Sequence, residues 1–377
     1  MTKTKTAIRI PPIDFGALLE DAEPVWRERL QELFARKHFI LGPQLAAFEE
    51  EWGAFIEPGR ARAVGVANGT DAIELALRDA GVNDSKQEVL TTALTAPFTG
   101  IGICGTGAQI RFCDVDPETL LMDPSDAARR ITKRTAAIVP VHLYGQACDL
   151  SQLGSLAKES SAVLMQDAAQ AHGAMHRGKP LTHYGPYVTY SFYPTKNLGA
   201  LGDGGAIVTP GKAVENRLRQ WRDGGRRPGG QVSYFIGRNS RLDELHCCYL
   251  RAFLTRLADW NADRRRLAAR YDASLAGCPG LRLVKTNEFS VRHLYVIRTK
   301  RRTALREFLS ARGIFTGIHY PVPLHLMPAF SSAGLKRGSL PNAEQAAREV
   351  LSLPLYPRMP DRFADETAEV IRAFFKR

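Results

Sequence analysis

The segment SFYPTKNLGALGDGG, residues 191–205, places one lysine, Lys196, between an aromatic, strand-like run and a turn crowded with glycine. Glycine allows the backbone to turn tightly and allows a ligand to approach it closely. A lysine held in such a turn needs a partner for its amine, because burying an unpaired charge costs free energy. The segment therefore indicates a chemical role for Lys196.

Short apolar runs lead up to this lysine and follow it. They occupy residues 61–67, 88–93, 109–115, 136–143, 161–167, 187–193 and 205–209. Continuous apolar runs, unlike strict alternations, are typical of parallel strands covered on both faces. Helical patterns over residues 70–81 and 149–160 separate some of these runs. We therefore predict an α/β doubly wound fold in which helices cover both faces of a mostly parallel seven-stranded sheet.

The sequence pattern changes after about residue 240. A long helical tract is followed by one strand-like run and two further helical patterns, over residues 241–277, 292–299, 303–313 and 361–376. A chain of 377 residues also exceeds the size of one minimal core. The predicted units are an N-terminal arm (1–24), a large cofactor-binding domain (25–257) and a small C-terminal α+β domain (258–377).

The formal net charge of +12 raises the question of an anionic partner. The arginines between residues 217 and 270 are interspersed with acidic residues and form no basic arm. A solvated arginine-rich surface explains this pattern best, followed by attraction of a small anionic substrate. Nucleic acid ranks last, so we predict no nucleic-acid partner.

The cysteines and the N-terminal residues bear on the cellular compartment. The six cysteines show no CxxC spacing, so we expect neither a metal site nor a disulfide framework. The first residues lack the apolar core of a secretory signal. Residues 89–110 carry no charge and are long enough to span a bilayer, but half of them are Thr, Gly, Pro and Gln. The sequence predicts a cytoplasmic protein without a membrane segment.

Three polar signals follow predicted strands, where open parallel sheets collect their ligands. Gly69 and Thr70 open a helix after the run 61–67, and the amides at a helix start form a phosphate cradle. Asp167 ends one apolar run, and Lys196 follows another. A phosphate cradle, an aspartate and a lysine together are the groups that pyridoxal phosphate requires.

The chemistry of this cofactor gives each residue type a role. The amine of Lys196 would form a Schiff base with the cofactor aldehyde and would then move protons. Asp167 would keep the pyridine nitrogen protonated. Gln170 would donate to the phenolic oxygen, and Ser191 would add a hydroxyl to the phosphate. Taken singly, each residue also has a structural explanation, such as a helix cap for Asp167 or a solvated side chain for Gln170.

Eight blocks of the sequence together resemble the DegT/StrS family of pyridoxal-phosphate-dependent nucleotide-sugar aminotransferases. In order, they are FILGPQLAAFEEEW, VANGTDAIELAL, VPVHLYGQ, QDAAQAHG, SFYPTKNLGALGDGGAIVT, NSRLDEL, GIHYPVPLH and REVLSLPLYP. The likeness extends from about Phe39 to Pro357. It implies the aspartate-aminotransferase fold, fold type I, and a homodimer whose active sites lie at the subunit interface.

The resemblance also implies roles for individual residues. The cofactor residues would be Lys196 at the aldehyde, Asp167 at the pyridine nitrogen, Gln170 at the phenolic oxygen, and Gly69, Thr70 and Ser191 at the phosphate. Asn239 matches an asparagine that reaches the phosphate of the neighbouring subunit. The segments that line the sugar-nucleotide pocket contain Tyr193, His319 and Tyr320.

Two positions depart from the family pattern. Ala96 stands where an aromatic residue usually stacks on the cofactor ring, and Phe98 follows two residues later. Either Phe98 takes over the stacking, or the ring face is less covered. Arg238 replaces a tyrosine that is common before NSRLDE, and its charge would serve either a substrate diphosphate or the surface.

The activity implied by the resemblance is transfer of an amino group from an amino acid, glutamate, to a keto group of a nucleoside-diphosphate ketosugar. The block VHLYGQ (141–146) favours the 3-position of the sugar over the 4-position, and lysine at position 196 favours transamination over deoxygenation.

Two alternatives remain. One is an NAD-dependent dehydrogenase, because GIGICG (100–105) matches GxGxxG. This motif lies in the second βαβ unit, however, and glycines that pack helices would explain it. The other alternative is a non-enzymatic regulator that binds pyridoxal phosphate.

Overall fold

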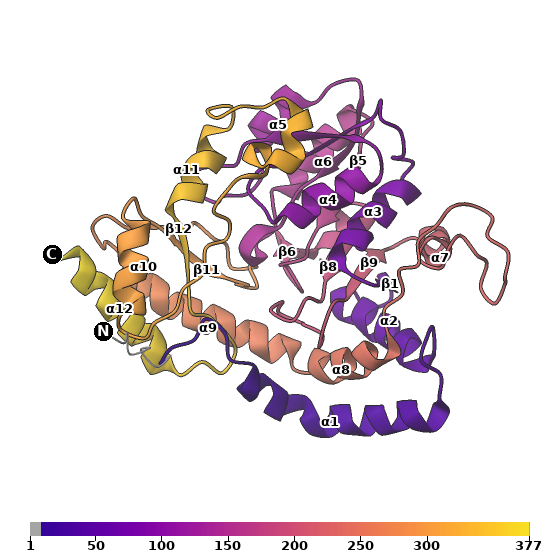
Figure 1. Cartoon of the computed structure of the whole chain (residues 1–377), viewed down its shortest axis with the longest axis horizontal. Helices are drawn as coiled ribbons and strands as arrows, with labels where there is room; N and C mark the ends of the chain where they lie inside the picture. The colour runs from indigo at the N-terminus through magenta and orange to yellow at the C-terminus, as the bar shows by residue number, and fades with distance from the viewer. Residues whose placement is uncertain (1–8, 377) are drawn as a thin grey trace, which may run out of the picture.

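A seven-stranded sheet forms the centre of the larger part of the molecule in the computed structural model, which describes residues 9–376 (Figure 1). Its strands are β1 (Arg62–Val66), β2 (Glu88–Thr92), β3 (Gln109–Cys113), β4 (Thr135–Val139), β5 (Val163–Asp167), β8 (Tyr187–Ser191) and β9 (Gly205–Thr209). Their order is β1-β9-β8-β5-β4-β2-β3. Within this described sheet, β9 runs antiparallel to both of its neighbours, β1 and β8, whereas the other neighbouring strands pair in parallel. The seven predicted strands and the mostly parallel sheet are confirmed.

Helices cover both faces of this sheet. The helices of this larger part are α1 (Phe15–Arg36), α2 (Pro43–Ile56), α3 (Gly69–Asp79), α4 (Pro97–Gly105), α5 (Pro124–Arg130), α6 (Leu150–Glu159), α7 (Lys212–Trp221) and α8 (Glu244–Leu254). Of these, α1 packs against α8, and α8 packs against α2. On β8, the ring of Tyr190 lies edge-on to Trp52 of α2, with centroids 5.1 Å apart. The hydroxyl of Tyr187, also on β8, donates to Asp79 of α3 at 2.8 Å. Successive side chains of a strand point to opposite faces, so α2 and α3 lie on opposite sides.

The C-terminal part has a small antiparallel sheet and a hydrophobic core of its own. Its elements are α9 (Leu257–Leu275), β10 (Arg282–Leu283), β11 (Tyr295–Arg298), α10 (Arg302–Ser310), α11 (Pro341–Glu349), β12 (Val350–Leu353) and α12 (Asp361–Phe375). Ile10, near the N-terminus, also belongs to this core and pairs with Ile314. A short hairpin of β6 (Met175–His176) and β7 (Lys179–Pro180) lies in the larger part.

Two predicted boundaries fall inside or beside helices. The helical tract predicted over 241–277 is two helices, α8 and α9, with a break at Thr255 and Arg256. Helix α1 runs without a break through residue 24, so the predicted end of the arm lies inside a helix. Residue 257 begins α9, which contributes Trp260 to the large core and Tyr271 to the small one. The division into domains therefore stays a prediction.

No helix within residues 9–376 is long and apolar enough to cross a membrane. In the same part of the chain, no group of three or more His, Cys, Asp or Glu side chains is arranged to hold a metal ion. All six cysteines are free thiols, and Cys104 alone among them is exposed.

The GIGICG motif lies within α4, where its glycines allow close helix packing. A Cβ atom at Gly102 would lie 2.8 Å from the backbone oxygen of Thr70 and 2.9 Å from the side chain of Ile73, both in α3. At Gly105, a Cβ atom would lie 2.7 Å from the carboxylate of Glu74. The motif therefore has a packing explanation, and the dehydrogenase alternative loses its support.

Replacing Gly102 with alanine should lower the free energy of unfolding by about 1–3 kcal/mol, because the added methyl group overpacks the contact between α4 and α3. Thermal unfolding measures this change. Gly154→Ala in α6 is the matched control, since its Cβ atom would lie 4.0 Å from the nearest atom, a methyl group of Leu164. That control should keep or slightly raise the melting temperature. An unchanged melting temperature in G102A would contradict the packing explanation.

Candidate active site

Lys196 lies in the turn that connects β8 to β9. The backbone amide of Ala200 donates to the carbonyl of Phe192 at 2.7 Å and closes this turn. A Cβ atom at Gly199 would lie 2.3 Å from the carbonyl oxygen of Pro194, so the turn requires glycine there. The glycine-rich sequence therefore holds Lys196 at the carboxyl end of β8.

Asp167 ends β5, the strand beside β8, so the sheet itself brings it to the same edge as Lys196. Its carboxylate accepts hydrogen bonds from the hydroxyl of Thr99 at 2.8 Å and from the backbone amide of Ala169 at 3.0 Å. Burial raises the pKa of Asp167, whereas these hydrogen bonds and the charge of Lys196 act in the opposite direction. Sequence analysis did not identify Thr99 as part of this site, although it ends the block TAPFT.

The amine of Lys196 is suited to act as a nucleophile. Burial lowers its pKa to about 8, and the negative charge of Asp167 opposes this shift. Within residues 9–376, the Nζ atom has no hydrogen-bond partner. An amine whose pKa lies near neutral is partly uncharged at physiological pH, and the uncharged form attacks carbonyl carbons.

The start of α3 packs against the end of β8, beside these two residues. Asn68 caps the helix by accepting a hydrogen bond from the amide of Asp71 at 2.8 Å. A Cβ atom at Gly69 would lie 2.7 Å from the Cβ atom of Ser191 at the end of β8. The amides of Gly69 and Thr70 and the hydroxyl of Ser191 therefore come together, as a phosphate cradle requires.

Gln170 connects the large sheet to the segment that carries His319 and Tyr320. Its side-chain oxygen accepts from the backbone amide of Tyr144 at 2.8 Å, and its Nε2 donates to the hydroxyl of Tyr320 at 3.0 Å. The hydroxyl of Tyr144 donates to the carbonyl of His319. Tyr144 lies in the block VHLYGQ but was not among the predicted site residues.

His319 and Tyr320 are electrostatically linked to the central pair. Burial and the charge of Lys196 lower the pKa of His319 to about 4. Burial and the charge of Asp167 raise the pKa of Tyr320 to about 12. Both side chains are therefore uncharged near neutral pH.

A buried hydrogen-bond network anchors the residue that follows the lysine. The amide nitrogen of Asn197 donates to Asn261 of α9 at 2.7 Å, and its oxygen lies 2.9 Å from Nδ1 of His293. Asn261 in turn donates to the carbonyl of His172 at 2.9 Å. Sequence analysis did not single out Asn197 or His293, and the only available signal was the position of Asn197 beside Lys196.

Three other predicted residues lie on the surface of the described chain. Tyr193 is 52% exposed, and Asn239 is exposed and forms an isolated bridge with Asp223. Phe98 is 60% exposed on α4, and Ala96 precedes it as the N-cap residue. The partner-subunit role of Asn239 and the identity of the ring-stacking residue therefore stay predictions.

Arg238 is held by an ion pair with Glu74 at 2.7 Å. Glu74 also pairs with Arg78 at 2.7 Å, so the two arginines share one carboxylate at the edge of α3. This contact favours the surface role for Arg238 over contact with a substrate diphosphate.

The residues present fit pyridoxal phosphate. The phosphate cradle would hold the phosphate group, since no Cβ atom fits at Gly69. Asp167 offers a buried carboxylate for the ring nitrogen, and Lys196 offers an unpartnered amine for the aldehyde. Gln170 presents its amide nitrogen at the same edge of the sheet.

Asp167→Asn should lower the pKa of Lys196 below about 8 in the apoprotein, because the negative charge that raises this pKa is removed. The measurement is the pH dependence of the rate at which trinitrobenzenesulfonate modifies Lys196, followed by peptide mass spectrometry. Since the neutral amine reacts, the midpoint should move to lower pH. Asp203→Asn, in the same turn, removes an exposed carboxylate and should leave the midpoint unchanged. Equal midpoints for D167N and wild type would show that Asp167 does not act on this amine.

Known proteins resemble this chain in sequence and in fold along nearly its whole length. Residues 22–374 match the DegT/DnrJ/EryC1/StrS aminotransferase family. A dTDP-3-amino-3,4,6-trideoxy-alpha-D-glucose transaminase from Streptomyces venezuelae is 40% identical over 372 residues, covering 98% of this chain and 97% of the relative. A Geobacillus stearothermophilus protein named pleiotropic regulatory protein is 39% identical over 374 residues, covering 98% and 99%.

The crystal structure of S. venezuelae DesV in complex with a ketimine intermediate superimposes with a TM-score of 0.94 at 39% identity, covering 99% of this chain and 100% of that chain. The predicted family, fold and cofactor class are confirmed. The chain belongs to the DegT/DnrJ/EryC1/StrS aminotransferase family, and the protein is a pyridoxal-phosphate-dependent aminotransferase.

Proposed function

We propose that the protein transfers an amino group from an amino acid to a keto group of a nucleotide-linked sugar. The observation that carries the proposal is the pairing of a near-neutral amine, Lys196, with the buried carboxylate of Asp167 beside the phosphate cradle at Gly69. Such an amine can remove a proton from one carbon and return it to another, as transamination requires. A relative that forms a dTDP-linked amino sugar supports the substrate class.

Each residue of the site would have its own chemical role. Pyridoxal phosphate, when bound, supplies an aldehyde and a ring that accepts electrons. Asp167, oriented by Thr99, would hold a proton on the ring nitrogen. Gln170 would donate its Nε2 hydrogen to the phenolic oxygen, and Lys196 would move protons between the carbon atoms.

The sugar-nucleotide substrate would enter on the side of Tyr193, His319 and Tyr320. Tyr193 is half exposed, and Tyr320 reaches the cofactor region through its hydrogen bond to Gln170. We propose amination at the 3-position of the sugar, with glutamate as amino donor. The likeness of the block VHLYGQ to relatives that act at the 3-position supports this proposal, and so does the relative whose product carries a 3-amino group.

We also propose a homodimer in the cytoplasm, with active sites shared between subunits. The segment between α7 and α8 that precedes Asn239 protrudes from the rest of the molecule (Figure 1). It carries exposed apolar side chains. Val232 is 62%, Tyr234 58% and Ile236 94% exposed. Apolar side chains so close together favour contact with another protein surface. A second copy of this chain would cover them and would bring Asn239 to its phosphate cradle.

Lys196→Ala should abolish turnover and the visible absorption of bound pyridoxal phosphate, because no other residue can replace the covalent link. The assay incubates the holoenzyme with glutamate and dTDP-, UDP- and GDP-linked 3-keto and 4-keto sugars, and identifies aminated products by mass. Lys212→Ala, a surface lysine, is the control and should retain activity. Retained turnover in K196A would reject the assignment. A wild-type protein that binds pyridoxal phosphate but aminates no sugar would favour the regulatory alternative.

Shared active sites predict complementation between two inactive subunits. A subunit with Lys196→Ala lacks the amine of its own site but still supplies Asn239 to the other site of the dimer. A subunit with Asn239→Ala keeps its own amine but cannot supply the phosphate contact to the other site. A mixed dimer of K196A and N239A subunits would place both defects in one site and leave the other intact. Co-expression with two affinity tags should therefore restore part of the activity. No recovery in purified mixed dimers would contradict shared sites.

A further inference from the structure

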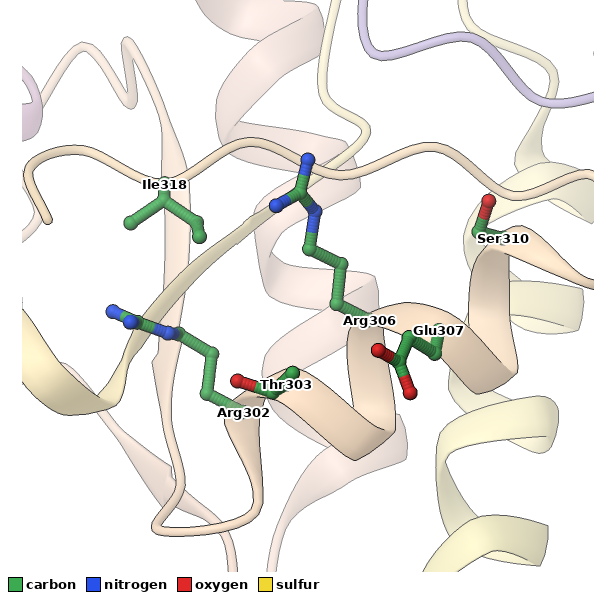
Figure 2. A pocket seen from close by; sticks show the side chains of 6 residues that line it. All are labelled: Arg302, Thr303, Arg306, Glu307, Ser310 and Ile318. Carbon is green, nitrogen blue, oxygen red and sulfur yellow. The ribbon is translucent and has the colours of Figure 1, made fainter.

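A cavity of about 480 Å³ lies in the C-terminal part, on the outer side of α10. It is lined by Arg302, Thr303, Arg306, Glu307, Ser310 and Ile318 (Figure 2). Two arginines, two hydroxyls and one carboxylate therefore surround a space large enough for a small ligand. None of these residues belongs to the cofactor site described above.

The two arginines of this cavity lack carboxylate partners. Arg302 donates to the backbone oxygen of Ala347 at 2.5 Å, and Arg306 makes no hydrogen bond or ion pair within the described residues. They are one helical turn apart, so their charges face the same space. Figure 2 shows the guanidinium groups of Arg302 and Arg306 on the side of the view where Ile318 lies, with the Glu307 carboxylate apart from both. Burial and the charge of Arg306 lower the pKa of Arg302, in line with positive charges left uncompensated.

A neighbouring cavity provides a contrast. It is also rich in basic residues, and its volume is about 550 Å³. There, however, Arg298 pairs with Glu349 at 2.9 Å, and the guanidinium of Arg301 lies 4.1 Å from the ring centroid of Phe374. Those two arginines already have partners, so an anion would compete for them with the carboxylate of Glu349 and the ring of Phe374. In the cavity at Arg302 and Arg306, no carboxylate of the described residues competes for either guanidinium, and only the backbone oxygen of Ala347 accepts from Arg302.

One wall of the cavity continues into the active site. Ile318 lines the cavity and is followed directly by His319. The preceding residue, Gly317, exchanges backbone hydrogen bonds of 3.0 and 2.8 Å with Ser352 of β12. The hydroxyl of Ser352 also lies 2.8 Å from Nδ1 of His319. A ligand that contacts Ile318 would therefore lie beside the backbone pairing of Gly317 with Ser352, which positions His319.

We propose that the cavity at Arg302 and Arg306 is a binding site for a phosphate-bearing anion, separate from the cofactor phosphate cradle. Guanidinium groups bind phosphate oxygens in bidentate fashion, and the hydroxyls of Thr303 and Ser310 add donors of fitting size. Glu307 offers an acceptor for a hydroxyl group on the same ligand. The net positive charge of the protein does not by itself explain why two arginines without carboxylate partners line the same cavity.

The phosphate group can come from two sources. It can be the diphosphate of the sugar-nucleotide substrate, or a free phosphate compound that binds as an effector. In the first case, occupancy contributes to the Michaelis constant of the ketosugar. In the second case, the ketosugar does not occupy the site, so its Michaelis constant measured without the effector does not depend on Arg306.

The test measures binding of inorganic pyrophosphate to the pyridoxal-phosphate-loaded holoenzyme by isothermal titration calorimetry in a phosphate-free buffer. Arg306→Ala should weaken binding by about tenfold, since one charge-assisted bidentate contact is lost. Arg306 has no partner in the described chain, so its removal should leave the fold intact. Arg265→Ala is the matched control, because it removes an exposed, unpartnered arginine of α9 away from the cavity. Glu307→Gln should strengthen binding, since a repelling charge is removed.

Weaker binding in R306A with wild-type affinity in R265A supports the site. Absence of saturable binding to the wild type, or equal affinities of R306A and wild type, overturns it. The Michaelis constant of the ketosugar then separates the two sources: an increase in R306A with unchanged kcat indicates the substrate diphosphate, and no change indicates an effector. The calorimetric result does not depend on sugar amination, so it stays interpretable even if the proposed function fails.

Discussion

The interaction on which this site depends is the electrostatic attraction between the buried carboxylate of Asp167 and the amine of Lys196. Burial by itself would keep both groups uncharged, because each loses the water that solvates its ionised form. Each charge offsets part of this cost for the other. The hydrogen bond from Thr99 further favours the carboxylate. The amine is left with a pKa near neutral, which suits proton transfer at physiological pH.

The sheet makes this pairing possible. Asp167 and Lys196 are 29 positions apart in the sequence, but β5 and β8 are adjacent and parallel, so their carboxyl ends lie side by side. Strand β1 lies beside β9 in the sheet, and helix α3, which follows β1, packs against β8. The start of α3 therefore lies at the same edge. Three short motifs thus share one edge of the sheet, as expected for an open α/β architecture.

The second hydrophobic core gives the site its other wall. Helix α9 takes part in both cores, and through Asn261 it contacts Asn197, beside the lysine. The segment that leaves the small core leads to His319 and Tyr320, and the hydroxyl of Tyr320 accepts a hydrogen bond from Gln170. The cavity at Arg302 and Arg306 is lined by Ile318 of this segment, so the basic surface of the small part borders the residue that precedes His319.

The strands, the phosphate cradle and the central pair could be predicted from local sequence, since each rests on a short pattern: a continuous apolar run, a glycine at a helix start, or a lysine in a glycine-rich turn. The contacts of Gln170 with Tyr144 and Tyr320, the bond from Thr99, and the network of Asn197 could not, because their partners lie far apart in the sequence. The break between α8 and α9 was missed for a related reason: long-range packing, more than local propensity, sets where these helices begin and end. Residue types and short patterns thus specify the chemistry of the site, whereas the packing of two cores against one sheet edge specifies its geometry.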